Sequence, residues 1–359
     1  MSRRLLGLAI LGAVVVLTVL ATVLDLGPLT RGGGPERVAV SIYYGGEKSA
    51  LLADPEIQAV LDRHGVDLDA VKAGSVEQAT TLDHAGKDCL WPSTALAVEY
   101  ARQSGKPVIA ATTLLNAPMV LYAWDEVAEA LIEAGVAFER GGFLRADLDA
   151  LVGLVEEGAR WREDLGVAVY GAFKVHSTDP TKSNSGNIWA AMLATAMNGG
   201  ETPDRAAMGR LLPRLDAYFQ RLGHMEASSG DIFENFLKQG MGARPLIVGY
   251  ENQLVEFLEA HPDRAALIRE RIRVIYPEPT VFSSHPLVSL TPACARLAEA
   301  LEDPEAQAIA WARHGFRTGL IGVENDPDAI AVARLPERVD VVQPLPRAEA
   351  MTVLIEALR

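Results

Sequence analysis

The segment that decides how this chain is interpreted reads Ser177-Thr178-Asp179-Pro180-Thr181-Lys182-Ser183-Asn184-Ser185-Gly186-Asn187-Ile188-Trp189. Residues 171–175 before it predict a strand, and residues 188–194 after it are typical of an apolar helix. Because a helix start offers free N–H groups and a partial positive charge, the connecting loop favours binding of an anion or a carboxylate. Gly186 would let the backbone approach that ligand closely. The loop concentrates four small hydrogen-bonding side chains within five residues: Thr181, Ser183, Asn184 and Ser185. A well-capped helix start is the alternative interpretation.

The N-terminal 34 residues predict where the protein is located. Arg3 and Arg4 precede a run of 20 uncharged residues, 5–24, which is long enough to cross a bilayer as a helix. The two arginines predict a cytoplasmic N-terminus, so a single-pass anchor would leave the rest of the chain extracytoplasmic at the cell membrane. A cleaved signal peptide, giving a secreted protein, is the alternative, although its apolar region is usually about 7–15 residues.

The composition is that of an ordinary globular protein, with 49% hydrophobic and 22% charged residues. The net charge of −14 disfavours nucleic acid and anionic membrane surfaces as partners. The two cysteines and seven scattered histidines form no metal-ligand motif, so neither a metal site nor a cofactor is predicted. About 325 residues after the apolar run exceed one small core and suit two lobes.

Along the chain, short apolar runs alternate with amphipathic helical patterns, which indicates an α/β fold with a mostly parallel sheet. One unit recurs four times: an apolar strand, a polar turn, and then a helix. The turns fall at residues 45–49, 92–94, 179–185 and 249–252. Ligands of open α/β sheets bind outside the carboxyl ends of the strands, so we expect these turns to meet at a cleft between the lobes.

Four segments give the chain a resemblance to a known family. They are the first-strand loop 43–49 (YYGGEKS), the crossover 116–121 (NAPMVL), the loop 178–186, and the return crossover 276–287. Residues 314–317 (HGFR) are a weaker fifth feature. On these segments the chain resembles the type II extracytoplasmic solute-binding proteins of ABC transporters. Within them it is similar to the phosphate, sulfate and molybdate branch, and to members associated with von Willebrand factor A domains.

The resemblance implies a two-lobed periplasmic-binding-protein-like type II fold with a ligand cleft, preceded by the transmembrane helix. Residues 1–34 would be the signal-anchor and linker, 35–118 the first part of lobe 1, 119–281 lobe 2, and 282–359 the return to lobe 1 with C-terminal helices. It implies a non-enzymatic, membrane-tethered protein that captures a small polar or anionic solute for import or sensing, with an ABC permease as a partner. Carried over by position, the ligand contacts would be Ser49, Ser93, Thr94, Thr181, Ser183, Asn184, Ser185, Tyr250, Glu251 and Asn252.

Several residues depart from a simple oxyanion site. The crossover has Ala117 where a serine is common in the family, and the first loop carries Glu47 and Lys48. Asp179 and Glu251 would accept hydrogen bonds from a protonated oxyanion, a polyol or an amine-bearing ligand, which the sequence leaves as alternatives.

Two other functions stay open from the sequence. An enzyme on the same scaffold would use Asp179 or Glu251 as a base. A ligand-free interaction module would instead dock a membrane assembly or a von Willebrand factor A-type partner. If the C-terminal segment returns to lobe 1, Cys89 and Cys294 would share that lobe, which permits a disulfide outside the cytoplasm.

Overall fold

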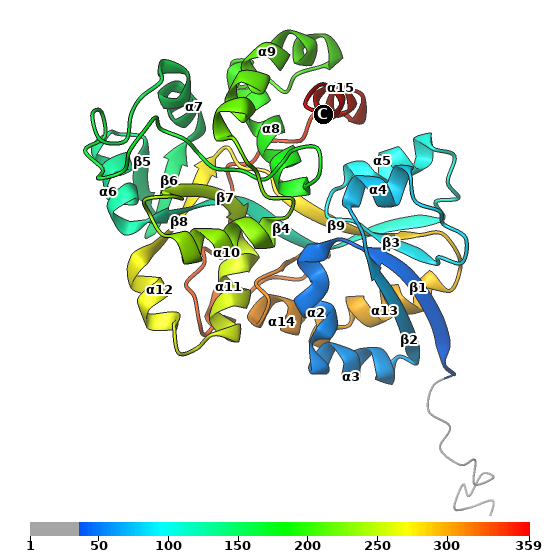
Figure 1. Ribbon diagram of the computed structural model, residues 1–359. Helices are drawn as coiled ribbons and strands as arrows, with labels where there is room; N and C mark the ends of the chain where they lie inside the picture. The colour runs from blue at the N-terminus through cyan, green and yellow to red at the C-terminus, as the bar shows by residue number, and fades with distance from the viewer. Residues whose placement is uncertain (1–35) are drawn as a thin grey trace, which may run out of the picture. The chain divides into compact units, whose positions relative to one another are not determined.

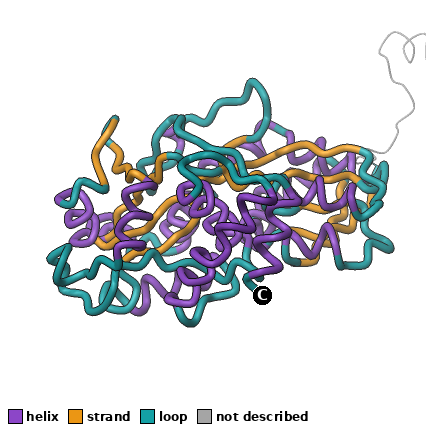
Figure 2. The backbone as a smooth tube through the Cα atoms, turned by 90° about the horizontal axis from the view of Figure 1, so that it is seen from above, coloured by secondary structure: helices purple, strands orange, loops and turns teal. Residues whose placement is uncertain are grey.

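The structure is a computed structural model that describes residues 36–359 (Figure 1). The predicted signal-anchor and linker at residues 1–34 lie outside this part of the chain. Within residues 36–359, no helix combines the length and apolar character needed to cross a membrane. Helices and strands alternate along the backbone, as the sequence pattern predicts (Figure 2).

The first half of the molecule, called lobe 1 here, is built on a mixed sheet, which corrects the expectation of a mostly parallel one because β9 (Phe282–Ser289) and β4 (Ala110–Trp124) pair antiparallel. The parallel strands are β2 (Val66–Lys72), β1 (Val38–Tyr44) and β3 (Cys89–Trp91), and β9 (Phe282–Ser289) runs antiparallel beside β3. The helices of this lobe are α2 (Ser49–Ala53), α3 (Pro55–Arg63), α4 (Ser75–Thr80), α5 (Leu96–Gln103), α13 (Cys294–Glu302) and α14 (Pro304–Ala312), after the short turn η1 (Gly46–Lys48). The single helix expected from residue 49 is broken because Asp54 caps a second helix that starts at Pro55.

One long strand, β4 (Ala110–Trp124), passes from lobe 1 into the second half, lobe 2. Its first part, to Pro118, pairs with β9, whereas residues 119–124 pair with β7 (Leu246–Tyr250) and β8 (Ile272–Glu278). The sheet of lobe 2 is completed by β6 (Phe143–Asp147) and β5 (Ala137–Arg140). Sequence patterns divided β4 into two shorter strands at 107–112 and 116–124, because its central residues include Asn116 and Pro118.

The helices of lobe 2 pack around this sheet. They are α6 (Asp125–Glu133), α7 (Leu148–Glu157), α8 (Asn184–Met197), α9 (Arg205–Leu222), α10 (Ser229–Gln239), α11 (Glu251–Ala260) and α12 (Ala265–Arg271). The strand expected at residues 171–175 does not form; Ala172 makes an isolated bridge to Arg160, and His176, just after this stretch, makes one to Ile247 of β7. The backbone N–H and C=O groups of His176 both form hydrogen bonds with β7, so they are satisfied although no strand forms here.

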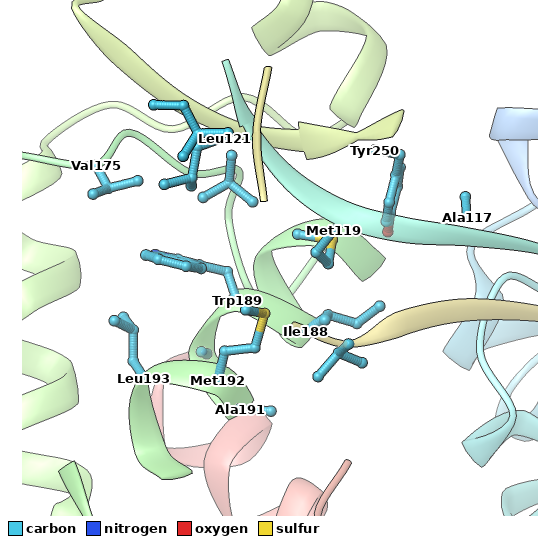
Figure 3. Close-up of a cluster of buried hydrophobic side chains, with 14 of the residues drawn as sticks. Ala117, Met119, Leu121, Val175, Ile188, Trp189, Ala191, Met192, Leu193 and Tyr250 are labelled. Atoms are coloured by element: carbon cyan, nitrogen blue, oxygen red, sulfur yellow. The ribbon is translucent and has the colours of Figure 1, made fainter. Parts of the chain in front are cut away.

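Helix α8 is buried on every side, as Figure 3 shows for Ile188, Trp189 and Met192 beside Met119 and Leu121 of β4. Every residue from 185 to 195 is buried, so this helix lacks the polar face of a surface helix. The start of α8 is thereby held by the core of lobe 2.

The C-terminal segment contacts both lobes. Strand β10 (Arg317–Thr318) pairs with Asn116 and Leu115 of β4, and the turn η2 (Pro327–Ala329) follows. Helix α15 (Ala348–Ala357) packs against α9 and α8 of lobe 2 and also against α5 of lobe 1. The segment 282–359 therefore does not remain with lobe 1 beyond α14, since hydrophobic residues of 332–339 pack on the core of lobe 2.

Cys89 of β3 and Cys294 of α13 form a disulfide, with their Cα atoms 5.6 Å apart. Both cysteines belong to lobe 1, as the return of the chain through β9 requires. A bond between residues 205 positions apart restricts the unfolded chain and stabilises the fold by about 2–5 kcal/mol.

Candidate ligand-binding cleft

A cavity of about 600 Å³ lies where turns of lobe 1 and lobe 2 face each other. Lobe 1 contributes residues from the turn after β1 (45–50) and the turn after β2 (72–77). Lobe 2 contributes residues from the start of α8 (182–184), the start of α10 (227–230) and the first turns of α11 (252–256). The volume is in the range of small-molecule sites, and the position at strand ends fits the rule for open α/β sheets.

Asn252 is the most informative residue of this cavity. The residue belongs to the cavity lining although it is only 1% exposed. Both amide atoms, Oδ1 and Nδ2, are buried and have no hydrogen-bond partner among the described residues. A buried amide without partners costs about 1–3 kcal/mol, so this position stabilises the fold poorly. It offers two donors and one acceptor to a molecule in the cavity.

Asn184, at the start of α8, connects the two lobes at the cavity. Its Nδ2 atom donates to the carbonyl of Ser93 in lobe 1 at 2.6 Å and to the hydroxyl of Tyr250 in lobe 2 at 3.0 Å. The Ser283 hydroxyl lies 3.4 Å from the same nitrogen and itself donates to the Ser93 carbonyl at 2.7 Å. These uncharged contacts hold the lobes together at one end of the cavity.

A buried lysine lies behind the first loop. The Lys48 Nζ atom is 3.0 Å from the Ser93 hydroxyl and 2.9 Å from Nδ1 of His285. Burial lowers the pKa of Lys48 to about 7, with the charge of nearby Glu47 opposing the shift. Ser93 in turn donates its hydroxyl to the Glu47 carboxylate at 2.6 Å, so it positions a cavity residue rather than lining the cavity itself.

The loop 178–186 satisfies most of its polar groups internally. Asp179 accepts from the Thr181 amide at 2.9 Å and from the Thr181 hydroxyl at 2.7 Å, which is an Asx turn. The Ser185 hydroxyl lies 2.8 Å from that of Thr178 and 3.0 Å from that of Ser183. A Cβ atom on Gly186 would lie 2.3 Å from the Thr178 carbonyl oxygen, so the close approach at this glycine is to the chain's own backbone. Residues 182–184 of this loop belong to the cavity lining, whereas Thr181 and Ser185, the other expected ligand contacts of the loop, lie outside it.

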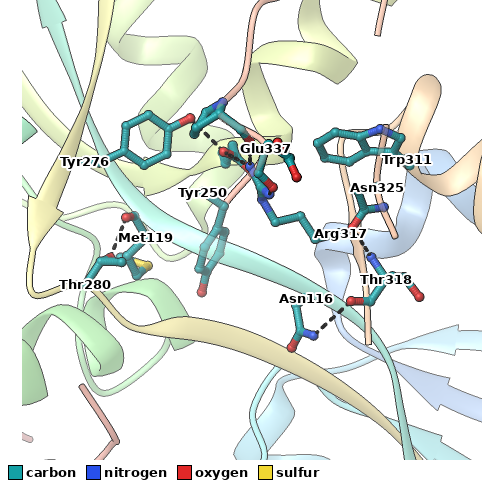
Figure 4. A network of polar contacts seen from close by, with 12 residues as sticks. Asn116, Met119, Tyr250, Tyr276, Thr280, Trp311, Arg317, Thr318, Asn325 and Glu337 are labelled. Atoms are coloured by element: carbon teal, nitrogen blue, oxygen red, sulfur yellow. Dashed lines mark hydrogen bonds and ion pairs between the residues drawn. The ribbon is translucent and has the colours of Figure 1, made fainter. Parts of the chain in front are cut away.

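Glu251 is engaged in a separate network with Arg317 and Tyr276, two residues that Figure 4 labels. Its carboxylate accepts from Arg317 at 2.7 and 3.0 Å and from the Tyr276 hydroxyl at 2.6 Å, and the residue is fully buried. Figure 4 shows the Arg317 side chain extending from beside Trp311 toward Tyr276. This arrangement leaves Glu251 outside the cavity lining and gives it a structural partner.

The ten predicted contact residues therefore divide into two groups. Those that line the cavity are Ser49, Ser183, Asn184 and Asn252. Those that lie outside its lining are Ser93, Thr94, Thr181, Ser185, Tyr250 and Glu251. In the second group, the Thr94 hydroxyl accepts from the Leu96 amide, and the Tyr250 hydroxyl serves Asn184.

Three lining positions were missed as contacts by sequence reasoning. Glu47 was noted only as a departure from the family, and the turn after β2, with Lys72, was missed because that strand was not predicted. Glu256 lies one helical turn after Asn252 and accepts from His314 at 3.2 Å. Its position four residues after Asn252 was the available signal, because residues at that spacing share a helix face.

A second hollow of about 800 Å³ lies between residues 202–209 and 344–350. None of the described residues that line it carries a buried side-chain nitrogen or oxygen without a partner. The cavity with Asn252 is therefore the better candidate site, although it is the smaller of the two.

No protein-family profile and no curated protein matches this sequence. Solved structures do match. Iron-bound HitA from Pseudomonas aeruginosa is 14% identical with a TM-score of 0.59, over 90% of this chain and 98% of that one. The apo ferric ion-binding protein A from Pasteurella haemolytica is 14% identical with a TM-score of 0.56, over 89% and 95%. A Bordetella ferric binding protein is 16% identical with a TM-score of 0.53, over 89% and 96%.

These similarities show the fold. The chain has the mixed α/β, two-lobed architecture of the type II periplasmic binding proteins, which confirms the broader part of the sequence-based expectation. The similar structures are described by what they bind, not by a reaction they catalyse. Among residues 36–359 of this chain, no group of three or more His, Cys, Asp or Glu side chains is placed to hold a metal ion.

Proposed function

We propose that this protein is an extracytoplasmic solute-binding protein that holds a small polar molecule between its lobes, for import or sensing. The N-terminal apolar segment would tether it to the membrane, and an ABC permease would be its partner for import. The observation that carries the proposal is Asn252, a residue of the cavity lining whose buried amide has no hydrogen-bond partner among the described residues. The fold of binding proteins supports it.

Lobe closure around a ligand fits the contacts at the cavity. The Asn184–Ser93 hydrogen bond joins the lobes by a single side chain, and such a contact can open and close with a hinge motion. The chain passes between the two sheets at β4 and again between β8 and β9, which are the places for a hinge. The proposal assigns no catalytic step to Asp179 or Glu251, because internal partners occupy both carboxylates.

The test is thermal unfolding of the full-length chain with a panel of amino acids, amines, organic acids, sugars, oxyanions and ferric ion. A ligand present at 100 times its Kd should stabilise the protein by about 2.7 kcal/mol and raise its Tm by a few degrees. A rise that disappears in an Asn252→Leu variant would support the cleft as the site. A flat response to the whole panel would contradict the proposal and favour the alternative, a module that docks a von Willebrand factor A-type or membrane partner.

A further inference from the structure

The charged residues that line the cleft differ in how deeply they are buried. Glu47 of lobe 1 and Glu256 of lobe 2 are half-buried, whereas Lys72, Glu77 and Lys182 are exposed. Lys182 is 65% exposed in its side chain and forms an ion pair with Asp179 at 3.0 Å. The half-buried charged groups of the lining are thus two carboxylates, one from each lobe.

Each of these carboxylates has one hydrogen-bond partner among the described residues and further acceptor capacity. Glu47 accepts from the Ser93 hydroxyl, and Glu256 is 3.2 Å from His314, which is shared with Asp54 at 3.0 Å. Burial raises the pKa of Glu256, and the charge of Glu47 adds to that shift while His314 opposes it. Because an ionised carboxylate has about four acceptor positions, both groups can accept more hydrogen bonds from a ligand.

The nearby cation does not reach the cavity. Lys48 lies beneath the first loop with its Nζ atom directed at Ser93 and His285, and it does not belong to the cavity lining. Lys72 and Lys182, the lysines of the lining, are exposed, so an oxyanion beside Glu47 and Glu256 would meet two half-buried carboxylates.

Two of the helix starts at the cavity are also less available to an anion than the sequence suggested. At α10, the Ser228 hydroxyl accepts from the Asp231 amide at 3.2 Å. At α11, Gln253 accepts from the Tyr250 amide at 2.8 Å and the Tyr122 hydroxyl accepts from the Leu254 amide at 3.2 Å. Capped amides of this kind offer little to a bound carboxylate or phosphate.

From this geometry we infer that the ligand is a small organic cation. Its ammonium or guanidinium N–H groups would donate to Glu47 and Glu256 from opposite sides, and a further polar group would pair with the amide of Asn252. Charge-assisted hydrogen bonds of this type are about twice as strong as neutral ones, so they would draw the two lobes together. The inference rests on the proposed function and names its ligand class.

The test is isothermal titration calorimetry on the full-length chain in mild detergent, with two groups of probes. The cations are 1,4-diaminobutane and agmatine, and the other probes are sulfate, phosphate, succinate and ferric citrate. We expect binding of a cation, weakened about tenfold or more by Glu47→Gln. The glutamine oxygen can still accept the hydrogen bond from the Ser93 hydroxyl, so this variant should fold. The matched control is Glu129→Gln on α6, which removes one negative charge from an exposed position outside the cleft and should change the affinity less than about twofold.

The outcomes separate the ligand class from the function. Binding of an oxyanion or ferric ion, with no cation bound, overturns the cation inference but leaves a solute-binding protein. Equal weakening by Glu47→Gln and Glu129→Gln overturns the placement of the cation between the carboxylates. Failure of every probe in both groups overturns the inference and counts against the proposed function as well.

Discussion

The starts of α8 and α11, both at the cleft, differ in how their polar side chains are hydrogen-bonded. The loop before α8 is rich in serine and threonine, and these side chains bond one another and the adjoining backbone. The start of α11 has fewer such residues, yet it carries Asn252, whose buried amide has no partner. Closely spaced small polar residues can therefore build a tight turn by bonding one another. A buried polar group without a hydrogen-bond partner is the stronger indication of a ligand.

The largest effect should come from breaking the α8 turn. Gly186→Ala would place a Cβ atom 2.3 Å from the Thr178 carbonyl oxygen and 2.9 Å from backbone atoms of Asp179 and Pro180. Because backbone cannot move aside as a flexible side chain can, we expect a loss of stability of about 3 kcal/mol or more. Urea unfolding measures it.

The matched control for this variant is Gly153→Ala in α7. No atom lies within 4 Å of a Cβ atom at Gly153, so alanine should stabilise the helix by about 0.5–1 kcal/mol. Equal effects of the two glycine substitutions would show that the α8 turn is not packed as described.

The second effect tests the start of α11. Asn252→Leu keeps the branched shape of the side chain but removes an amide without a partner among the described residues, so the ligand-free protein should keep its stability or gain about 1 kcal/mol. Affinity for the probe that binds in the calorimetric panel should fall about tenfold or more. A stability loss with unchanged affinity would assign Asn252 a structural role and would remove the main support for the cleft.

The third effect is smaller and returns to the serine-rich loop. Ser185→Ala removes hydroxyl contacts to Thr178 and Ser183, so we expect stability to fall by about 1 kcal/mol. Because Ser185 does not line the cavity, affinity should change less than about threefold. Unfolding and calorimetry on the same sample distinguish these results from those for Asn252→Leu.

Sequence patterns predicted the class of fold because it depends on hydrophobic periodicity, which is local. The predicted turns at 45–49, 92–94 and 249–252 lie at the ends of β1, β3 and β7, where α2, α5 and α11 begin. The antiparallel pair β5 and β6 and the exposed strand β2 were missed, since β2 buries few of its side chains. The crossover predicted around Pro118 lies where β4 passes from the sheet of lobe 1 to the sheet of lobe 2.

The site was less predictable than the fold because partner choice is not local. Glu251 pairs with Arg317, 66 residues away, and no spacing rule announces that the ion pair withdraws Glu251 from the cleft. The amide of Asn252, the next residue, has no hydrogen-bond partner among the described residues, and this too depends on which distant segments pack beside it. Two adjacent residues at one helix start thus have opposite roles, which only the packing of distant segments decides.

The smallest effect concerns how the α11 start is tied to lobe 1. His314 lies between Glu256 of α11 and Asp54 of lobe 1, at 3.2 and 3.0 Å. Burial lowers the pKa of His314, but the hydrogen bonds and charges of Glu256 and Asp54 outweigh burial and raise it above its usual value. The charged form is therefore favoured by folding. Its contribution is complete below about pH 6.5, the ordinary value for histidine, and is lost as the pH rises through the raised pKa.

A His314→Gln variant tests this tie between the lobes. Between about pH 6 and pH 8.5, wild-type stability should decline by up to about 1 kcal/mol relative to the variant, because Asp54 and the surface carboxylates stay ionised throughout that range. Urea unfolding midpoints at several pH values give the two slopes. Parallel slopes would mean that His314 does not titrate between the two carboxylates. A steeper wild-type slope, with cation affinity falling in step, would show that the α11 wall is held in place partly from lobe 1, unlike the self-contained turn of α8.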